Sequence, residues 1–241
     1  MTETDLVYLR NAYLTTDRTS VVATDGARVA LDRTILYPTG GGQPHDNGTL
    51  SWNGSTADVV DVRKDGSLVW CALADGAPVP SEGTTIEVSV DWDRRHALMR
   101  THTALHVLCG VIWNEWRTAV TGGNMEPLSA RMDFEFDPLP EGFGERVEEL
   151  VNVELRAARP IEVTFLPRET AVEDEDLIRT KVNLIPESVR EIRVVDIVGL
   201  DKQADGGTHV RTTDEVGLVR VLKTESKGKG NKRIRIEVVN G

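Results

Sequence analysis

The first 92 residues are divided by closely spaced turn signals, and this spacing constrains the fold more than any other feature of the sequence. Asp-Gly or Asn-Gly pairs recur at Asp25-Gly26, Asn47-Gly48, Asn53-Gly54, Asp65-Gly66 and Asp75-Gly76. The segments between these pairs are short and rich in β-branched residues. Short strands at this spacing are typical of small barrels and sandwiches. We therefore expect residues 1–92 to form an all-β domain, a small β-barrel.

The pattern changes near residue 92. From Arg94 to Arg117, apolar residues recur at helical spacing, and Asp91 or Asp93 can cap the start of this helix. The glycine pair within Thr121–Asn124 is expected to end it. Further along, the sequence predicts strands at 130–136, 161–165 and 191–196, helices at 141–159 and 171–180, and a hairpin at 216–239. Overall we expect an α+β protein: the barrel, then at residues 93–241 a two-layer α/β domain with an antiparallel sheet.

Composition restricts the setting in which the protein works. No run of 18 or more apolar residues occurs, so we expect no membrane span. The N-terminal segment is acidic and lacks an apolar signal core, which predicts a cytosolic protein. The only cysteines, Cys71 and Cys109, are far apart in sequence and do not make a disulfide framework.

Three of the five histidines fall in two short motifs. His102 and His106 are four residues apart on a predicted helix, so their imidazoles share one face. Asp205 and His209 are also four apart, across a glycine pair that allows a tight turn. Either motif alone is more typical of structural residues. Together they supply three nitrogen donors and one oxygen donor, a set that zinc accepts. Thr103 follows the first histidine, so the glutamate of a His-Glu-x-x-His protease helix is missing.

A glycine-rich segment interrupts the predicted barrel. Pro38–Pro44 contains three consecutive glycines followed by Gln43. Three glycines free the backbone to present its amides to an anion or to a close RNA backbone. A tight barrel corner explains the same residues, and both interpretations stay open.

The formal net charge is −11, so a nucleic-acid role requires a local basic patch. The C-terminal hairpin has such a patch, which consists of Arg220, Lys223, Lys227, Lys229, Lys232, Arg233 and Arg235. Glu225 is the acidic residue that lies among them. It is interpreted either as a phosphate-binding surface or as a solvated hairpin tip. Arg94, Arg95 and Arg100 are expected to extend the same surface. The acidic, lysine-poor composition is typical of proteins from salt-loving organisms.

Five ordered segments together resemble one family. They are Gly40-Gly-Gly-Gln-Pro44, Arg100-Thr-His-Thr-Ala-Leu-His106, Ala130-Arg-Met-Asp-Phe134, Gln203-Ala-Asp-Gly-Gly-Thr-His-Val210 and Glu225-Ser-Lys-Gly-Lys-Gly230. Their order and spacing resemble the alanyl-tRNA editing proteins of the AlaX type, free-standing relatives of the editing domain of alanyl-tRNA synthetase. The N-terminal β-domain resembles that of the longer members.

The resemblance implies a zinc ion held by His102, His106, Asp205 and His209, with Thr208 beside them in the catalytic site. Asp205 stands where the family commonly has cysteine, and an aspartate holds zinc less tightly than a thiolate does. Cys109, one helical turn beyond His106, is an alternative ligand.

The implied reaction is hydrolysis of the ester that joins a wrong amino acid, serine or glycine, to the 3′ end of alanine tRNA. The implied tRNA-binding residues are Gly41, Gly42, Gln43, Asn124, Arg131, Lys227, Lys229 and Arg233. Zinc would either activate water or hold the amine or hydroxyl of the substrate, and both roles stay open. The alternative function is a metal-stabilised tRNA-binding module without catalysis, because the departure at Asp205 affects a ligand.

Overall fold

The computed structural model describes residues 3–172, 177, 189–228 and 230–241. The chain divides into two compact units, Met1–Ala97 and Leu98–Gly241. The expected boundary between residues 92 and 93 lies at the start of helix α1 (Trp92–Trp116), and the two units divide within this helix. Among the described residues, no helix is both long and apolar enough to cross a membrane.

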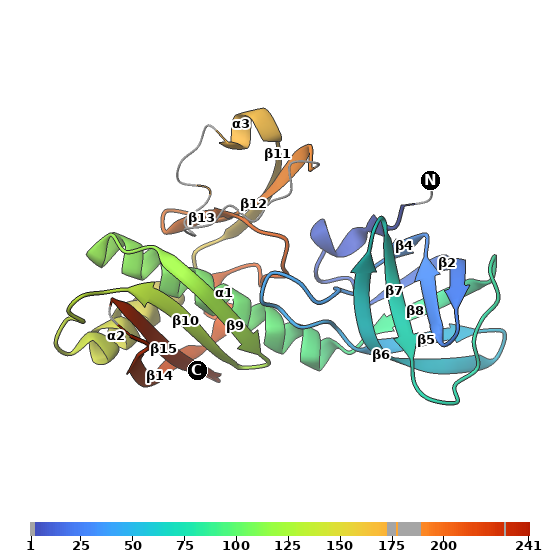
Figure 1. The fold of residues 1–241 in the computed structure, drawn as a ribbon, viewed down its shortest axis with the longest axis horizontal. Helices are drawn as coiled ribbons and strands as arrows, with labels where there is room; N and C mark the ends of the chain where they lie inside the picture. Colours follow the sequence, from blue (N-terminus) through green and yellow to red (C-terminus); the bar gives the residue numbers. More distant parts are fainter. Residues whose placement is uncertain (1–2, 173–176, 178–188, 229) are drawn as a thin grey trace. The chain divides into compact units, whose positions relative to one another are not determined.

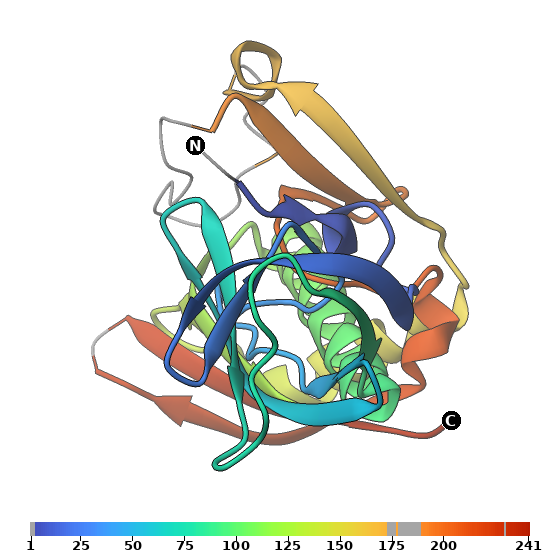
Figure 2. The same cartoon turned by 90° about the vertical axis from the view of Figure 1, so that its right-hand side faces the viewer.

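The first unit is a closed β-barrel, as the turn spacing predicted. Its strands follow the order β2-β3-β7-β6-β5-β8 around the ring, which is coloured blue to teal in Figure 1 and Figure 2. Neighbouring strands pair antiparallel. The barrel strands are β2 (Thr16–Asp25), β3 (Arg28–Leu31), β5 (Gly48–Trp52), β6 (Ser55–Asp65), β7 (Leu68–Leu73) and β8 (Thr85–Val90). The short strands β1 (Asp5–Leu6) and β4 (Arg33–Thr34) form a parallel pair beside them, with the 3-10 turn η1 (Val7–Leu9) between the two in sequence.

Local sequence explains one hairpin of the barrel and the inward face of one of its strands. Asn53 and Gly54 have φ angles of 46° and 80°, and this two-residue loop joins β5 to β6. Positive φ at both central residues gives the turn whose twist matches that of antiparallel strands. Along β8, Ile86, Val88 and Val90 are buried and alternate with more exposed residues. One face of the strand therefore joins the apolar core of the barrel.

Helix α1 keeps within two residues of its predicted range, but the segment expected to end it has another structure. The backbone N–H of Arg94 donates to Asp91 Oδ1 at 3.1 Å, which is an N-cap hydrogen bond. The helix ends at Trp116, and Arg117 has a φ of 55°. The expected break at Thr121–Asn124 is wrong, because this segment lies inside strand β9 (Val120–Glu126). A glycine pair is accommodated there as extended backbone.

The second unit combines two antiparallel sheets with helices. One sheet has the order β14-β15-β10-β9 and the other has the order β11-β12-β13 (Figure 1). The elements not yet given are β10 (Ser129–Glu135), α2 (Phe143–Arg156), β11 (Ile161–Pro167), α3 (Arg168–Val172), β12 (Glu191–Ile197), β13 (Asp201–Ala204), η3 (Thr213–Val216), β14 (Leu218–Ser226) and β15 (Asn231–Val239). The expected helix at 171–180 lies mostly outside the described residues, whereas the other predicted elements are present within a few residues of their expected bounds. The α+β fold class, a small barrel followed by an α/β region with antiparallel sheets, is confirmed.

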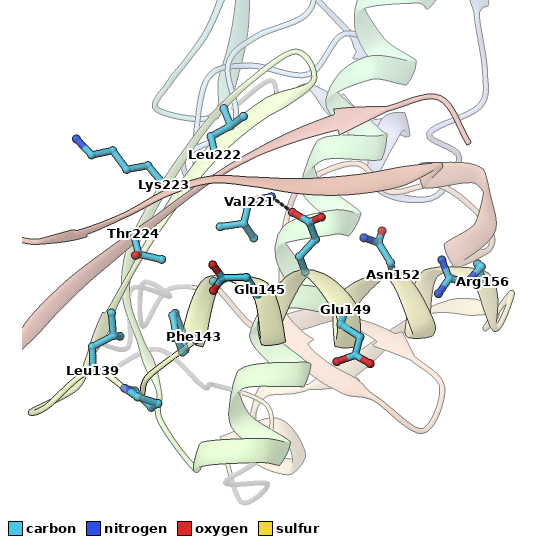
Figure 3. Close-up of a pocket in the computed structure, with 14 residues that line it drawn as sticks. Leu139, Phe143, Glu145, Glu149, Asn152, Arg156, Val221, Leu222, Lys223 and Thr224 are labelled. Carbon is cyan, nitrogen blue, oxygen red and sulfur yellow. Dashed lines mark hydrogen bonds between the residues drawn. The ribbon is translucent and has the colours of Figure 1, made fainter.

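Helix α2 covers the outer strand of the four-stranded sheet. The side chain of Asn152 exchanges two hydrogen bonds with the backbone of Val219, at 2.8 and 2.9 Å. The N–H of Val221 donates to Glu148 Oε2 at 2.6 Å (Figure 3). These side chains satisfy backbone groups of an edge strand that would otherwise stay unpaired. A pocket of about 670 Å³ lies between α2 and β14.

Candidate metal centre

Helix α1 and the segment after β13 bring four donor side chains together. His102 and His106 come from α1, and Asp205 and His209 follow β13. One donor atom from each residue lies within 4.8 Å of those of the other three. The ring centroids of His102 and His209 are 4.3 Å apart, and those of His106 and His209 are 4.6 Å apart. The two motifs that the sequence placed about a hundred residues apart therefore form one cluster.

Asp205 lies between two of the histidines. Its Oδ1 is 3.5 Å from His102 Nε2, and its Oδ2 is 3.0 Å from His209 Nε2. The backbone N–H of Gly207 donates to Asp205 Oδ2 at 2.7 Å, which closes the glycine turn on the carboxylate. Arg193 Nη1 donates to the main-chain oxygen of Asp205 at 2.8 Å. The carboxylate is thus oriented towards the imidazoles by its own turn and by strand β12.

Two of the histidines contact other side chains through Nδ1. His209 Nδ1 lies 3.2 Å from Thr103 Oγ1. His106 Nδ1 lies 3.2 Å from Asp201 Oδ2, within ion-pair distance, although the alignment falls short of a hydrogen bond. Because Nδ1 faces these outer groups, the Nε2 atoms of His106 and His209 are the nitrogens left for a shared ligand.

Burial and mutual charge set the protonation of the cluster. Burial lowers the pKa of His102 to about 4, although Asp205 acts in the opposite direction. Burial and the neighbouring His102 also hold the pKa of His209 well below its usual value. For His106, burial lowers the pKa, but Asp201 and Asp205 outweigh it, and the net shift is upward. Burial raises the pKa of Asp205, but His102 and His209 outweigh it, and the net shift is well below the usual value.

These donors fit a divalent metal ion of the zinc type. His102 and His209 are neutral near pH 7 and Asp205 is ionised there, which are the protonation states that bind metal. Three imidazole nitrogens and one carboxylate oxygen are a donor set that zinc accepts. The cluster found among the described residues does not include Cys109, so the alternative ligand suggested by the sequence is not supported. The pocket beside α2 has none of the four residues in its walls.

The other proposed site residues are distributed over both units. Thr208 is completely buried next to His209. Asn124 and Arg131 are directly opposed on β9 and β10, so the sheet brings them together. In the first unit, Gly40 and Gln43 form a bridge to each other, which folds the glycine segment into a compact loop. Tyr37 donates its hydroxyl hydrogen to the main-chain oxygen of Gly40 at 3.0 Å and anchors this loop, which includes Gly41 and Gly42.

Acidic partners neutralise much of the C-terminal basic patch. Arg233 makes a bidentate ion pair with Asp133 on β10, at 2.6 and 2.7 Å. Glu225 pairs with Lys223 at 3.0 Å and contacts Arg235 at 3.5 Å, and Arg220 lies 3.7 Å from Glu237. Lys227 is exposed near the end of the hairpin, and Lys229 lies outside the described residues. The hairpin is therefore less positive than its own sequence indicates.

Two of the arginines expected to extend this surface have structural roles instead. Arg95 is completely buried and makes an ion pair with Asp46 in the first unit. Arg100 Nε donates to the main-chain oxygen of Val216 at 2.8 Å, and its Nη2 donates to that of Val239 at 3.0 Å. That part of the prediction is wrong, because both guanidinium groups are used to join distant segments within a unit.

Sequence reasoning missed three residues around the cluster. Thr103, Arg193 and Asp201 are all buried and contact a proposed ligand. Thr103 lies on α1, one residue after His102, and was considered only as the position of a missing glutamate. Asp201 and Arg193 lie on a strand pair whose register no local pattern reveals. For Arg193 and Asp201, the signal available in the sequence was a charged residue at a strand position expected to be buried.

Comparison with known proteins identifies close relatives. Residues 192–235 match the family model "Threonyl and Alanyl tRNA synthetase second additional domain", and residues 6–94 match "tRNA synthetases class II (A)". The alanyl-tRNA editing protein AlaX-M of Saccharolobus solfataricus is 33% identical over 96% of this chain and 97% of its own length. AlaX-M of Methanosarcina barkeri is 32% identical over 98% and 100%. An alanine–tRNA ligase of Pyrobaculum neutrophilum is 38% identical over 83% of this chain, but this match covers 23% of the ligase.

Proposed function

The chain belongs to the AlaX-M family of alanyl-tRNA editing proteins, and on that premise we propose that it is a trans-editing hydrolase that deacylates mischarged alanine tRNA. The substrate would be alanine tRNA that carries serine, or glycine, on its 3′ end. Hydrolysis of this ester needs no ATP, and we propose that it takes place in the cytoplasm. The observation that carries the proposal is the convergence of His102, His106, Asp205 and His209.

We propose that these four residues hold one zinc ion. A bound zinc would supply Lewis-acid chemistry, through which water is activated or the amine or hydroxyl of the substrate is held. The chain itself contributes two imidazoles kept neutral by burial and a carboxylate kept ionised by its histidine neighbours. The three histidines are nearly buried, with 5–6% of each residue exposed, so this part of the site excludes most solvent water. Thr208, buried beside His209, is the proposed catalytic neighbour of the ligands.

The chemistry of discrimination supports an editing site that selects serine. A synthetic pocket shaped for a methyl group cannot strongly reject a slightly larger or smaller neighbour, so a second site is needed. A site that binds the serine hydroxyl leaves its own polar groups unpaired when alanine enters. The polar, nearly buried cluster is suited to such a penalty, because unpaired polar groups cost most where water is excluded.

We propose that tRNA is bound by three groups of residues outside the metal cluster. Gly41, Gly42 and Gln43 form the compact loop of the first unit, whose backbone amides suit a phosphate. The opposed pair of Asn124 and Arg131 supplies side-chain donors from the four-stranded sheet. On the hairpin we propose Lys227, Lys229 and Arg233. Of the last two, Lys229 lies outside the described residues, and Arg233 is already paired with Asp133.

Deacylation of alanine tRNA charged in turn with serine, glycine and alanine tests the proposal. We expect hydrolysis of the seryl form, and to a lesser extent of the glycyl form, with little hydrolysis of the alanyl form. A chelator should abolish the activity and added zinc should restore it. His102→Ala should behave like the chelated protein. His96→Ala is the matched control, because His96 lies on the same helix, stacks on Trp92 and is not in the cluster.

Each failure of this experiment has a separate meaning. If no charged form is hydrolysed while tRNA and metal still bind, the protein is a metal-stabilised tRNA-binding module. If the metal-free preparation retains full activity, zinc has no part in the reaction. If the alanyl form is hydrolysed as fast as the seryl form, the protein does not edit.

A further inference from the structure

Two of the proposed histidine ligands contact chemically different groups through Nδ1, the ring nitrogen that faces away from the cluster. The Nδ1 atom of His106 faces the carboxylate of Asp201, and the Nδ1 atom of His209 faces the hydroxyl of Thr103, both at 3.2 Å. We propose that Asp201 and Thr103 are positioning residues for the metal centre. Asp201 holds the proton of His106 on Nδ1, whereas Thr103 allows the proton of His209 to change nitrogen when Nε2 becomes a ligand. This inference rests on the proposed metal site and deepens it.

Towards His106 Nδ1, which lies 3.2 Å away without an aligned hydrogen bond, Asp201 can act only as an acceptor. A carboxylate has acceptor oxygens and no donor, so the nitrogen that faces it is expected to carry the hydrogen. The side chain of Asp201 is completely buried, and Gln203 Nε2 donates to its Oδ2 at 2.7 Å. The carboxylate is therefore held in one orientation, and the lone pair of His106 stays on Nε2. A carboxylate behind a ligating histidine is a recurrent device that fixes the ring and raises its basicity.

A glycine on α1 makes this approach possible. Gly110 lies four residues after His106, on the same face of the helix. A Cβ at this position would lie 2.9 Å from the main-chain oxygen of Leu200 and 3.0 Å from Asp201 Cβ. Helix α1 therefore packs directly against Leu200 and Asp201, where the β12–β13 turn meets strand β13. Any side chain at residue 110 would push Asp201 away from the imidazole.

Thr103 differs because its hydroxyl can donate as well as accept. The N–H of Val210 donates to Thr103 Oγ1 at 3.3 Å, which leaves the hydroxyl hydrogen and one lone pair for His209. In the present arrangement His209 Nε2 lies 3.0 Å from Asp205 Oδ2, so Nε2 carries the hydrogen and the hydroxyl donates to Nδ1. When Nε2 uses its lone pair for a metal, Nδ1 must carry the hydrogen. The hydroxyl of Thr103 then rotates and accepts it, without movement of the helix.

The positions of the two protons can be measured in protein labelled with ¹⁵N-histidine, by long-range proton–nitrogen correlation. In metal-free wild type, at a pH at which both rings are neutral, we expect His106 to carry its proton on Nδ1 and His209 to carry its proton on Nε2. On addition of zinc, His106 should keep its proton position and His209 should change to Nδ1. A neutral, metal-free His106 that carries its proton on Nε2, or a His209 that keeps one proton position in both states, overturns the inference.

Substitutions separate positioning from general structural support. Asp201→Asn keeps the shape but offers either an oxygen or an amide nitrogen to His106, so the single proton position should be lost. Zinc affinity, measured by competition with a chelator, should fall about 10- to 100-fold, the usual effect of removing an outer partner of a ligand. Thr103→Val should weaken zinc binding in the same way, whereas Thr103→Ser, which restores the hydroxyl, should recover it.

Two control variants remove similar groups from the same elements. Asp196→Asn changes a carboxylate on the same β12–β13 hairpin, opposite Lys202. Thr101→Val removes a buried hydroxyl of α1 that accepts from the N–H of Leu128 at 2.8 Å. Both should keep the wild-type proton positions and zinc affinity. If the control variants lose as much zinc affinity as the test variants do, the inference is overturned. A protein that shows the expected proton positions and binds zinc, but does not deacylate tRNA, refutes the proposed function alone.

Discussion

Loss of the Asp46 carboxylate should strongly destabilise the first unit. Asp46 and Arg95 are both completely buried, and Arg95 Nε donates to Asp46 Oδ1 at 2.9 Å. The N–H of Tyr37 donates to Asp46 Oδ2 at 2.6 Å. The same arginine also donates to the main-chain oxygens of Ala12 and Ile35. The substitution Asp46→Ala leaves the guanidinium buried without a counter-charge and leaves the Tyr37 amide without its acceptor.

The size of the effect follows from these two losses. Removing one partner of a buried ion pair costs about 3–5 kcal/mol, because an uncompensated charge stays in the interior. An orphaned buried amide costs about 1–3 kcal/mol more. The free energy of unfolding should therefore fall by at least about 4 kcal/mol, out of the roughly 5–15 kcal/mol typical of a domain. With a urea m-value of about 2 kcal/mol/M, the unfolding midpoint should move down by about 2 M.

Urea unfolding followed by circular dichroism measures the change. Asp25→Ala is the matched control, because Asp25 pairs with Arg28 on an exposed hairpin of the same barrel. Exposed pairs contribute about 0–1 kcal/mol, so the control should stay near wild type. The combined substitution of Asp46 and Arg95 by leucine and methionine should recover the part of the loss that comes from the uncompensated charge, because apolar residues can replace a buried pair, whereas the Tyr37 amide stays without its acceptor. If Asp46→Ala costs no more than Asp25→Ala, the reasoning is refuted.

Three further outcomes are expected. Asp205→Cys should tighten zinc binding and Asp205→Ala should weaken it in chelator competition, because thiolate is the softer ligand; equal affinities would show that residue 205 does not bind the metal. Lys227→Ala should reduce the salt slope of tRNA binding by up to about one unit, whereas Arg233→Ala should also reduce stability, because Asp133 loses its bidentate partner and keeps only the contact with Arg131 at 3.4 Å. An unchanged slope for Lys227→Ala, measured within the working salt range of the protein, would show that the hairpin end is a solvated tip and does not bind phosphates. Burial raises the pKa of Cys71 to about 12, so its thiol should react with a thiol reagent only after unfolding, and rapid labelling of the native protein would contradict this burial.

Local chemistry was sufficient to predict most elements of the fold. The Asn53-Gly54 pair defines a hairpin because both residues tolerate positive φ, and the two flanking strands follow from that turn. Asp91 and the apolar spacing after Arg94 define the start of α1. The glycine pair at Gly122-Gly123 misled the prediction, because pairing with β10 overrides the weak preference of glycine against strands.

The candidate ligands could be predicted for a similar reason. His102 and His106 share a helix face through their spacing alone, and Asp205 and His209 share a turn. That the two motifs meet was an expectation drawn from donor chemistry and from resemblance to a family. Their convergence within 4.8 Å depends on the packing of α1 against the β12–β13 hairpin, which no local pattern specifies.

Only the tertiary structure decided how the charged residues are used. Arg233 finds Asp133 one hundred positions away in sequence, and Arg95 finds Asp46 across 49 positions. Asp201 reaches His106 because Gly110 allows a helix and a turn to touch. In sequence, each of these residues is a charge with no visible partner. Periodicity and turn chemistry act over a few residues and can be read directly from the chain, whereas the partner of a buried charge depends on which distant segments the topology brings into contact.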